Sequence, residues 1–245
     1  MNLSELKTRR FGRSFQHHPS LDSTNRFLKD LAARGAEEGT TVLADEQSAG
    51  RGRWGRTWES APGKGILVSV LLRPPLGARI SQLTAVMGLA VLKALRPYAS
   101  QARLKWPNDI WVEEKKLSGL LLESSDGAVI AGLGLNVSQV PEDFSAELNA
   151  TSLKLTHGSE VDKEILLVDL LLKMEQAYEE WKAEGFEKAR REWEENACFM
   201  GEWIQASNGV TGKVLGMDAE GALLIRDDNG VRSLNSGELT RLRPA

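Results

Sequence analysis

Three glycines and three arginines fall within residues 47–58, a segment that contains no acidic residue. Glycines allow a backbone to wrap closely around a ligand. The forked guanidinium donors of Arg51, Arg53 and Arg56 match phosphate oxygens, and Trp58 could stack on a planar ring. The segment has neither the Walker A pattern nor the Rossmann order of strand, glycine turn and helix. Phosphate binding, RNA binding and a solvated basic turn all fit the segment taken alone.

Residues 105–109, Lys-Trp-Pro-Asn-Asp, place a proline where the surrounding pattern predicts a strand. Pro107 cannot donate to a sheet, so the strand must break there or lie at an edge. The break would project Asn108 and Asp109 out of the sheet, where Asp109 could bind a divalent metal or hold a basic side chain. A β-bulge with a capped turn explains the same residues equally well.

Lys116 stands at the mouth of an apolar strand and is followed by Gly119, which permits close approach of a ligand. A lysine there could lie over a carboxylate or a phosphate, or it could occupy a solvated hairpin turn. Glycines also interrupt the apolar residues 132–136, and they weaken a strand unless something packs against the backbone. Asn136 offers a donor and an acceptor suited to an adenine edge or a phosphate, with strand-on-strand packing as the alternative.

Composition limits the class of protein. The 245 residues carry 31 Lys and Arg against 34 Asp and Glu, and this net charge of −3 does not favour a general polyanion binder. The single cysteine, Cys198, excludes an internal disulfide, and His17, His18 and His157 form no metal-ligand pattern. No apolar run reaches about 18 residues and the N-terminus lacks a signal peptide, so we expect a soluble, cytoplasmic protein without a membrane partner.

Periodicity and turn residues predict the elements that position these segments. The expected helices cover residues 24–35, 81–95, 163–182 and 184–196, the first of them capped by side chains of residues 22–25. The expected strands cover residues 40–44, 66–72, 104–112, 117–123 and 128–137. Lys115-Lys116 and residues 125–127 would be turns. Tight turns between consecutive strands indicate an antiparallel meander rather than a doubly wound sheet.

The sequence pattern changes after residue 196. Short strands at even spacing, separated by Gly, Asp and Asn, are expected at residues 203–204, 212–215, 222–225 and 231–234. About 50 residues of this kind suggest a small β-barrel. We therefore expect two domains, residues 1–195 and residues 196–245.

Taken together and in order, five segments resemble the biotin protein ligases. They are residues 22–25 (Asp-Ser-Thr-Asn), 47–58, 105–109, 116–119 (Lys-Leu-Ser-Gly) and 132–136 (Gly-Leu-Gly-Leu-Asn). The resemblance implies an α+β fold: a mixed, largely antiparallel sheet flanked by helices, similar to class II synthetases, followed by a small SH3-like β-barrel. It also implies a two-step reaction, in which biotin and MgATP form biotinyl-5′-AMP and pyrophosphate, and an acceptor lysine then takes the biotinyl group.

The resemblance also implies roles for single residues. Ser23, Thr24 and Gln47 would bond the ureido ring of biotin, and Trp58 would pack on the adenylate. Lys116 and Arg53 would stabilise charge at the reacting centre, and Asp109 would orient charged groups or act as a general base. No residue is assigned as a metal ligand. The implied binding residues are Ser23, Thr24, Gln47, Gly50, Arg51, Arg53, Arg56, Trp58, Lys105, Asn108, Lys116, Gly119, Gly134 and Asn136.

The family further implies a biotin carboxyl carrier protein as acceptor, with a homodimer possible. Some members begin with a DNA-binding domain of roughly 60 residues, whereas here Ser23 and Thr24 lie close to Met1. We therefore expect a ligase without a repressor role or a DNA partner. Two alternatives are a lipoate–protein ligase of the same fold, whose different arginine motif is not seen, and a non-catalytic RNA-binding module, which the charge of −3 disfavours.

Overall fold

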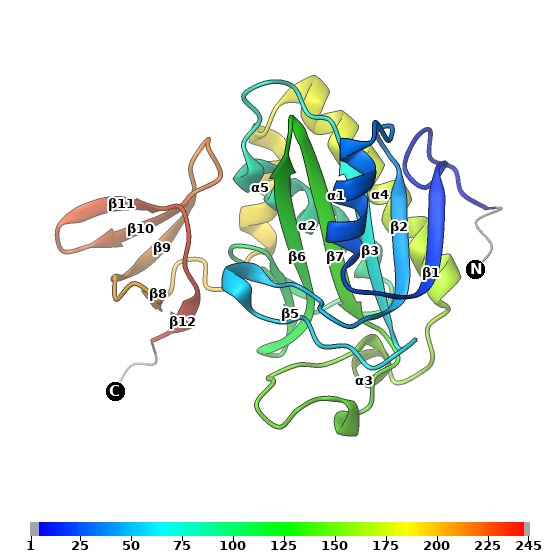
Figure 1. Ribbon diagram of the computed structural model, residues 1–245. Helices are drawn as coiled ribbons and strands as arrows, with labels where there is room; N and C mark the ends of the chain where they lie inside the picture. Colours follow the sequence, from blue (N-terminus) through cyan, green and yellow to red (C-terminus); the bar gives the residue numbers. More distant parts are fainter. Residues whose placement is uncertain (1–4, 243–245) are drawn as a thin grey trace.

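The computed structural model describes residues 5–242, which form a seven-stranded sheet and a five-stranded sheet (Figure 1). The larger sheet is mixed: β1 runs parallel to β2, and every other neighbouring pair is antiparallel. This confirms the predicted mixed, largely antiparallel sheet. Its spatial order is β1 (Phe15–Leu21), β2 (Thr41–Gln47), β3 (Gly65–Leu72), β7 (Ala128–Asn136), β6 (Lys115–Ser125), β5 (Asp109–Val112) and β4 (Arg103–Lys105).

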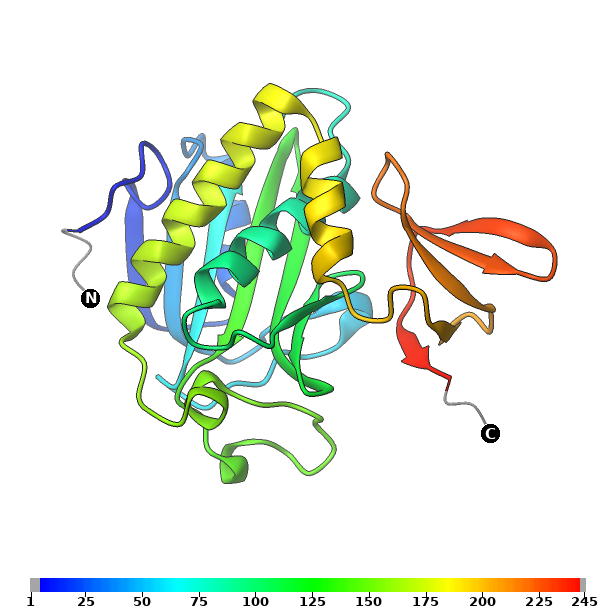
Figure 2. The same ribbon diagram turned by 180° about the vertical axis from the view of Figure 1, so that it is seen from behind.

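Helices cover both faces of this sheet. Helix α1 (Thr24–Ala33) lies on one face, in front of β3 and β7 in Figure 1. The other face carries α2 (Ile80–Leu95), α4 (Lys163–Glu184) and α5 (Glu187–Asn196), as Figure 2 shows. The main core lies on that side, because β3 is buried throughout and α2 packs against both α4 and α5. The short helices are η1 (Arg53–Gly55), η2 (Pro141–Asp143) and α3 (Leu153–His157).

Several element boundaries differ from the prediction. The turn expected at Lys115-Lys116 lies two residues earlier, at Glu113 and Glu114, which both have positive φ angles. Lys116 therefore belongs to β6, and this places its side chain at a fixed register position. The last helix of the larger unit begins at Glu187 rather than at residue 184, because Gly185 ends α4 with a φ of +80°.

Two further expectations were wrong. Strand β1 was missed, because its burial does not alternate and Pro19 interrupts its sequence. The Lys- and Glu-rich residues 175–195 predict a solvated helix face, but Glu175 is buried. Its carboxylate accepts the backbone N–H groups of Arg9 and Arg10 at 2.6 Å each and that of Phe11 at 2.9 Å. These contacts hold the N-terminal segment against α4.

The second sheet is antiparallel and follows α5. Its order is β11 (Gly230–Leu234), β10 (Leu223–Asp227), β9 (Thr211–Met217), β8 (Trp203–Ala206) and β12 (Leu239–Arg241). Closure of these strands into a barrel stays a prediction. We propose residues 1–195 and 196–245 as the two domains, since the connection to the second sheet starts where α5 ends. Within residues 5–242, no helix is both long and apolar enough to cross a membrane.

Candidate functional site

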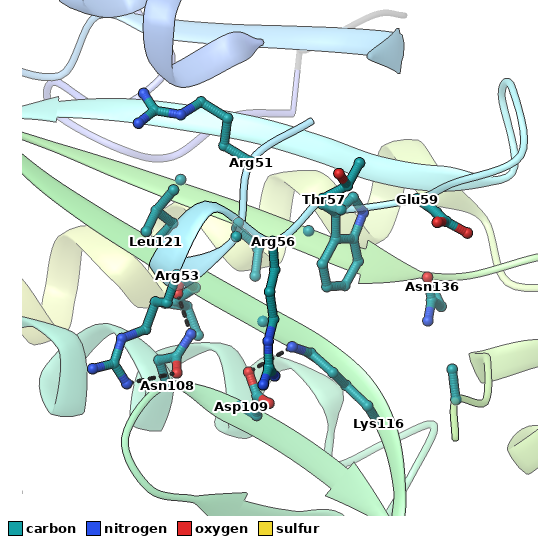
Figure 3. A pocket seen from close by; sticks show the side chains of 18 of the residues that line it. Arg51, Arg53, Arg56, Thr57, Glu59, Asn108, Asp109, Lys116, Leu121 and Asn136 are labelled. Carbon is teal, nitrogen blue, oxygen red and sulfur yellow. Dashed lines mark hydrogen bonds and ion pairs between the residues drawn. The ribbon is translucent and has the colours of Figure 1, made fainter. Parts of the chain in front are cut away.

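A pocket of about 380 Å³ opens over the glycine-containing strands β6 and β7, beneath the connection that joins β2 to β3. This connection, residues 48–64, is called the basic loop below. Figure 3 shows the side chains that reach into the pocket from these elements. The structure brings together all the predicted site residues except Gly50: Ser23, Thr24, Gln47, Arg51, Arg53, Arg56, Trp58, Lys105, Asn108, Asp109, Lys116, Gly119, Gly134 and Asn136.

Trp58 lies flat against the strands because two glycines leave room for its ring. A Cβ atom on Gly134 would overlap the indole, and one on Gly119 would come within 3.1 Å of it. The indole Nε1 is buried and has no hydrogen-bond partner among the described residues. Gly50 serves the loop itself: its carbonyl accepts the N–H of Trp58 at 3.0 Å, and a side chain would overlap the Trp58 carbonyl. The contacts of Gly119 and Gly134 with Trp58 explain why glycines interrupt the apolar strands β6 and β7.

One end of the pocket gathers cationic side chains around the carboxylate of Asp109. Lys116 Nζ lies 2.8 Å from Asp109 Oδ1 and 5.4 Å from the centre of the Trp58 ring (Figure 3). Lys105 Nζ lies 3.5 Å from the centre of the Trp111 ring. Burial lowers the pKa of Lys105, although Asp109 opposes that shift. The positive charges of Lys105 and Lys116 are therefore concentrated in a partly dehydrated site. An anionic ligand there would supply interactions that these charges have lost with water.

Arg53 belongs to this cationic end, and Arg51 does not. Arg53 Nη1 donates to Asn108 Oδ1 at 3.5 Å, and burial lowers the pKa of this guanidinium against the attraction of Asp109 and Glu238. In Figure 3 Arg51 points the other way, and its guanidinium lies 3.1 Å from Glu123 Oε1. Arg53 thus lies at the cationic end of the pocket, whereas Arg51 lies beside Glu123 on β6.

The absence of acidic residues from residues 47–58 does not leave the arginines of this segment unpaired. Arg51 pairs with Glu123 on β6, and Arg56 forms a two-point ion pair with Glu238, whose second contact is 3.0 Å long. Glu238 precedes β12 in the second sheet, so Arg56 joins the two parts of the fold. The acids that neutralise this segment come from distant parts of the chain.

The other end of the pocket is lined by neutral polar groups from α1 and β2. Gln47 Oε1 accepts both the backbone N–H of Thr24 at 2.6 Å and its hydroxyl at 3.0 Å. Ser23 occupies the N-cap position of α1, yet its side chain makes no capping hydrogen bond, contrary to the predicted cap. Because Ser23 and Thr24 are both buried, a ligand that reaches them is held away from bulk water.

Asn136 is bonded within the protein. Its Nδ2 donates to the Thr151 carbonyl at 3.0 Å, and its Oδ1 accepts from Gln139 Nε2 at 3.1 Å. The side chain thus holds the chain that returns past the pocket after β7. Contact of Asn136 with a nucleotide stays a prediction.

Several lining residues were missed in the sequence. Glu238 follows Arg56 by 182 positions, and no local pattern relates the two. Trp111 could have been found from its strand register, because β4 pairs with β5 and brings it beside Lys105. Asn25 lies in the first of the five segments, but only the fold shows that it packs on Gly132. The remaining missed residues include Phe144, Leu148, Asn149 and Ala150.

The residues present suit a metal ion that arrives with a phosphate ligand. Within the described part of the chain, no group of three or more His, Cys, Asp or Glu side chains could hold a metal ion. Mg²⁺ commonly binds one or two carboxylates together with substrate phosphates. Asp109, whose Oδ1 atom is buried beside Lys116, is the carboxylate at the cationic end.

Comparison with known proteins gives consistent matches along the chain. Residues 18–139 match the Biotin/lipoate A/B protein ligase family, and residues 206–239 match the Biotin protein ligase C terminal domain. The bifunctional ligase/repressor BirA of Bacillus subtilis is 37% identical over 96% of this chain and 76% of its own length. A biotin–[acetyl-CoA-carboxylase] ligase of Paracoccus denitrificans is 36% identical over 89% of this chain and 96% of its own length.

Solved structures agree with these matches. Biotin protein ligase from Aquifex aeolicus, solved in complex with biotin and ATP, superposes with a TM-score of 0.84 at 32% identity. The match covers 95% of this chain and all of that one.

Proposed function

Because this chain belongs to the biotin/lipoate A/B protein ligase family, we propose that it is a biotin–[acetyl-CoA-carboxylase] ligase. It activates biotin with ATP as biotinyl-5′-AMP and transfers the biotinyl group to a lysine of a carrier protein. One observation carries this proposal: a single pocket joins buried neutral polar groups at Thr24 and Gln47 to the cationic cluster of Lys105, Lys116 and Arg53. The neutral end suits a ureido ring, and the cationic end suits a carboxylate and phosphates.

The first step brings two anions together. The biotin carboxylate attacks the α-phosphorus of ATP, and pyrophosphate leaves with the electrons of the broken P–O bond. Lys116 and Arg53 offset the charge that accumulates, as fixed donors in a water-poor site do most effectively. Trp58 packs on the adenylate, and Mg²⁺ enters with ATP as part of that substrate.

The second step needs a neutral amine. Asp109 accepts a proton from the incoming lysine ammonium, and the amine attacks the carbonyl carbon of the mixed anhydride. An amide forms and AMP leaves. Because the anhydride is readily hydrolysed, the basic loop must cover it until the acceptor arrives.

The acceptor in this proposal is a biotin carboxyl carrier protein, such as the carrier subunit of acetyl-CoA carboxylase. The expected homodimer and cytoplasmic location enter the proposal unchanged. The binding roles of Ser23, Gly119 and Asn136 are also parts of it.

Exchange of labelled pyrophosphate into ATP tests the proposal against its rivals. We expect exchange that depends on biotin, and none when lipoate replaces biotin. Exchange driven by lipoate would assign the chain to the lipoate–protein ligases instead. No exchange with either acid would remove ligase chemistry and favour the RNA-binding alternative.

Replacement of Arg53 by alanine is expected to release the bound adenylate faster. A hydrogen bond from a charged donor contributes about 1.5–3 kcal/mol, which corresponds to roughly a 10- to 100-fold higher dissociation rate. The rate can be followed by chasing preformed labelled adenylate. Arg232→Ala is the control, because Arg232 pairs with Asp227 in the second sheet. Equal retention by both variants and the unaltered protein would show that Arg53 does not hold the phosphate.

A further inference from the structure

A line of polar side chains connects the neutral end of the pocket to β6. Gln47 accepts from the hydroxyl of Thr24, and Ser69 Oγ lies 2.8 Å from Thr24 Oγ1 and 2.7 Å from Asn25 Oδ1. Asn25 Nδ2 then donates to Glu123 Oε2 at 2.8 Å. Ser69, Thr24 and Asn25 are all buried. Each connection is of ordinary hydrogen-bond length, so the line is continuous.

Ser69 gives this line two alternative states. A hydroxyl carries one proton, so Ser69 can donate either to Thr24 or to Asn25 at any moment. A ligand N–H that donates to Thr24 Oγ1 takes the second lone pair of that oxygen and weakens its attraction for the Ser69 proton. Ser69 then donates to Asn25, which polarises the Asn25 amide and strengthens its bond to Glu123. Occupancy of the pocket therefore changes the bonding at β6.

The orientation of Asn25 is fixed by its surroundings. Its Nδ2 faces two acceptors, the Leu121 carbonyl at 3.1 Å and the Glu123 carboxylate, so the amide cannot be reversed. Gly132 gives the side chain its space, because a Cβ atom there would overlap Asn25 Oδ1. Gly132, in the fifth sequence segment, thus leaves room for the Asn25 side chain, just as Gly134 leaves room for the Trp58 ring.

Glu123 is the point where this line meets the basic loop. One carboxylate oxygen accepts from Asn25, and the other lies 3.1 Å from the Arg51 guanidinium. Arg51 is on the basic loop and Glu123 is on β6, so their ion pair anchors the first half of the loop to the sheet. Arg56 anchors the second half independently, through Glu238.

We infer that Glu123 is a positioning residue that couples occupancy of the pocket at Thr24 and Gln47 to closure of the basic loop through Arg51. The inference rests on the proposed function, because it takes biotin as the ligand at that end of the pocket. Glu123 acts through Arg51 and Asn25 and has no contact with the reacting atoms.

Hydrogen exchange of the backbone amides of residues 48–58, with and without biotin, tests the coupling. In the unaltered protein we expect biotin to slow this exchange. In Glu123→Gln we expect biotin affinity to fall about tenfold, within the range typical of coupling between sites, and most of the biotin-induced protection to be lost. Arg51→Gln should give the same losses, and the double variant should be no worse than either single one.

Ser69→Ala and Glu220→Gln complete the experiment. Ser69→Ala interrupts the line, so biotin should still bind but protect the basic loop less. Glu220 pairs with Arg79 on the surface, and its replacement should change neither biotin affinity nor protection of the loop. A thermal melt of each variant identifies any general loss of folding.

The outcomes separate the coupling from the proposed function. Failure of the unaltered protein to bind biotin would overturn the proposed function. If Glu123→Gln binds biotin normally, and biotin still protects the basic loop fully in this variant, the coupling is overturned and the proposed function stands. Additive losses in the double variant would show that Glu123 and Arg51 act separately, which also contradicts it.

Discussion

Replacement of Lys116 by glutamine is expected to lower the rate of biotinyl-5′-AMP formation about 100- to 1000-fold, the usual cost of removing one transition-state donor. Lys116 Nζ sits between Asp109, at 2.8 Å, and the ring of Trp58. In the proposed first step, Lys116 stabilises the charge shared by the biotin carboxylate and the α-phosphate. Glutamine keeps a similar length and loses the charge, so the loss reports electrostatic stabilisation. Single-turnover formation of the adenylate measures it.

Lys115→Gln is the matched control for this prediction. Lys115 precedes Lys116 on β6, but successive strand residues point to opposite faces, and Lys115 is exposed. Its replacement should leave adenylate formation unchanged. If Lys116→Gln also kept the normal rate while folding normally, Lys116 would have no part in the chemistry.

Replacement of Asp109 by asparagine is expected to slow transfer of the biotinyl group to the carrier lysine about 100-fold or more. A positioned general base contributes roughly 100- to 10,000-fold to a proton-transfer step, and asparagine cannot take up the proton. Asp109 begins β5, directly after the break at Pro107, and its carboxylate faces Lys116 at the cationic end of the pocket. Transfer from preformed, purified adenylate measures this step alone.

Pyrophosphate exchange in the same variant shows whether the defect is specific. We expect exchange to be affected less than transfer, because removal of a proton from the acceptor lysine belongs to the second step alone. Asp126→Asn is the control, since Asp126 lies in the turn between β6 and β7 at a φ of 46°, a conformation that asparagine tolerates. Normal transfer by Asp109→Asn would leave Asp109 an orienting role only.

Much of the site could be predicted because its residues lie in short, ordered segments. Lys105, Asn108 and Asp109 flank one strand break, and Lys116 and Gly119 follow on the next strand. Strands joined by tight turns must lie side by side, so closeness in sequence becomes closeness in space. Local patterns together with the family resemblance predicted these residues, and the structure brings them to one end of the pocket.

The contacts that were missed are those between distant parts of the chain. Arg51 meets Glu123 and Arg56 meets Glu238 only because the folding of the two sheets brings them together. The indole of Trp58 explains Gly134, but the glycine itself indicates only that something packs there. A glycine inside a strand, or a charge without a local partner, indicates that another residue packs or pairs there. Only the fold shows which residue that is.

Helix α4 shows the same limit in the core. Ile165 is 64% exposed although its side chain is large and apolar, whereas Leu166, Leu170 and Met174 are buried. A helix with apolar residues around much of its circumference has no single face that periodicity can select. Packing against α2 decides which side is buried.

The most direct test of the central claim is to isolate the intermediate. The unaltered protein is incubated with biotin and MgATP in the absence of a carrier protein, and the bound small molecules are identified by mass spectrometry. We predict that biotinyl-5′-AMP is recovered from the protein and that it disappears, with release of AMP, when a biotin carboxyl carrier domain is added. Recovery of unchanged biotin and ATP under these conditions would contradict the account.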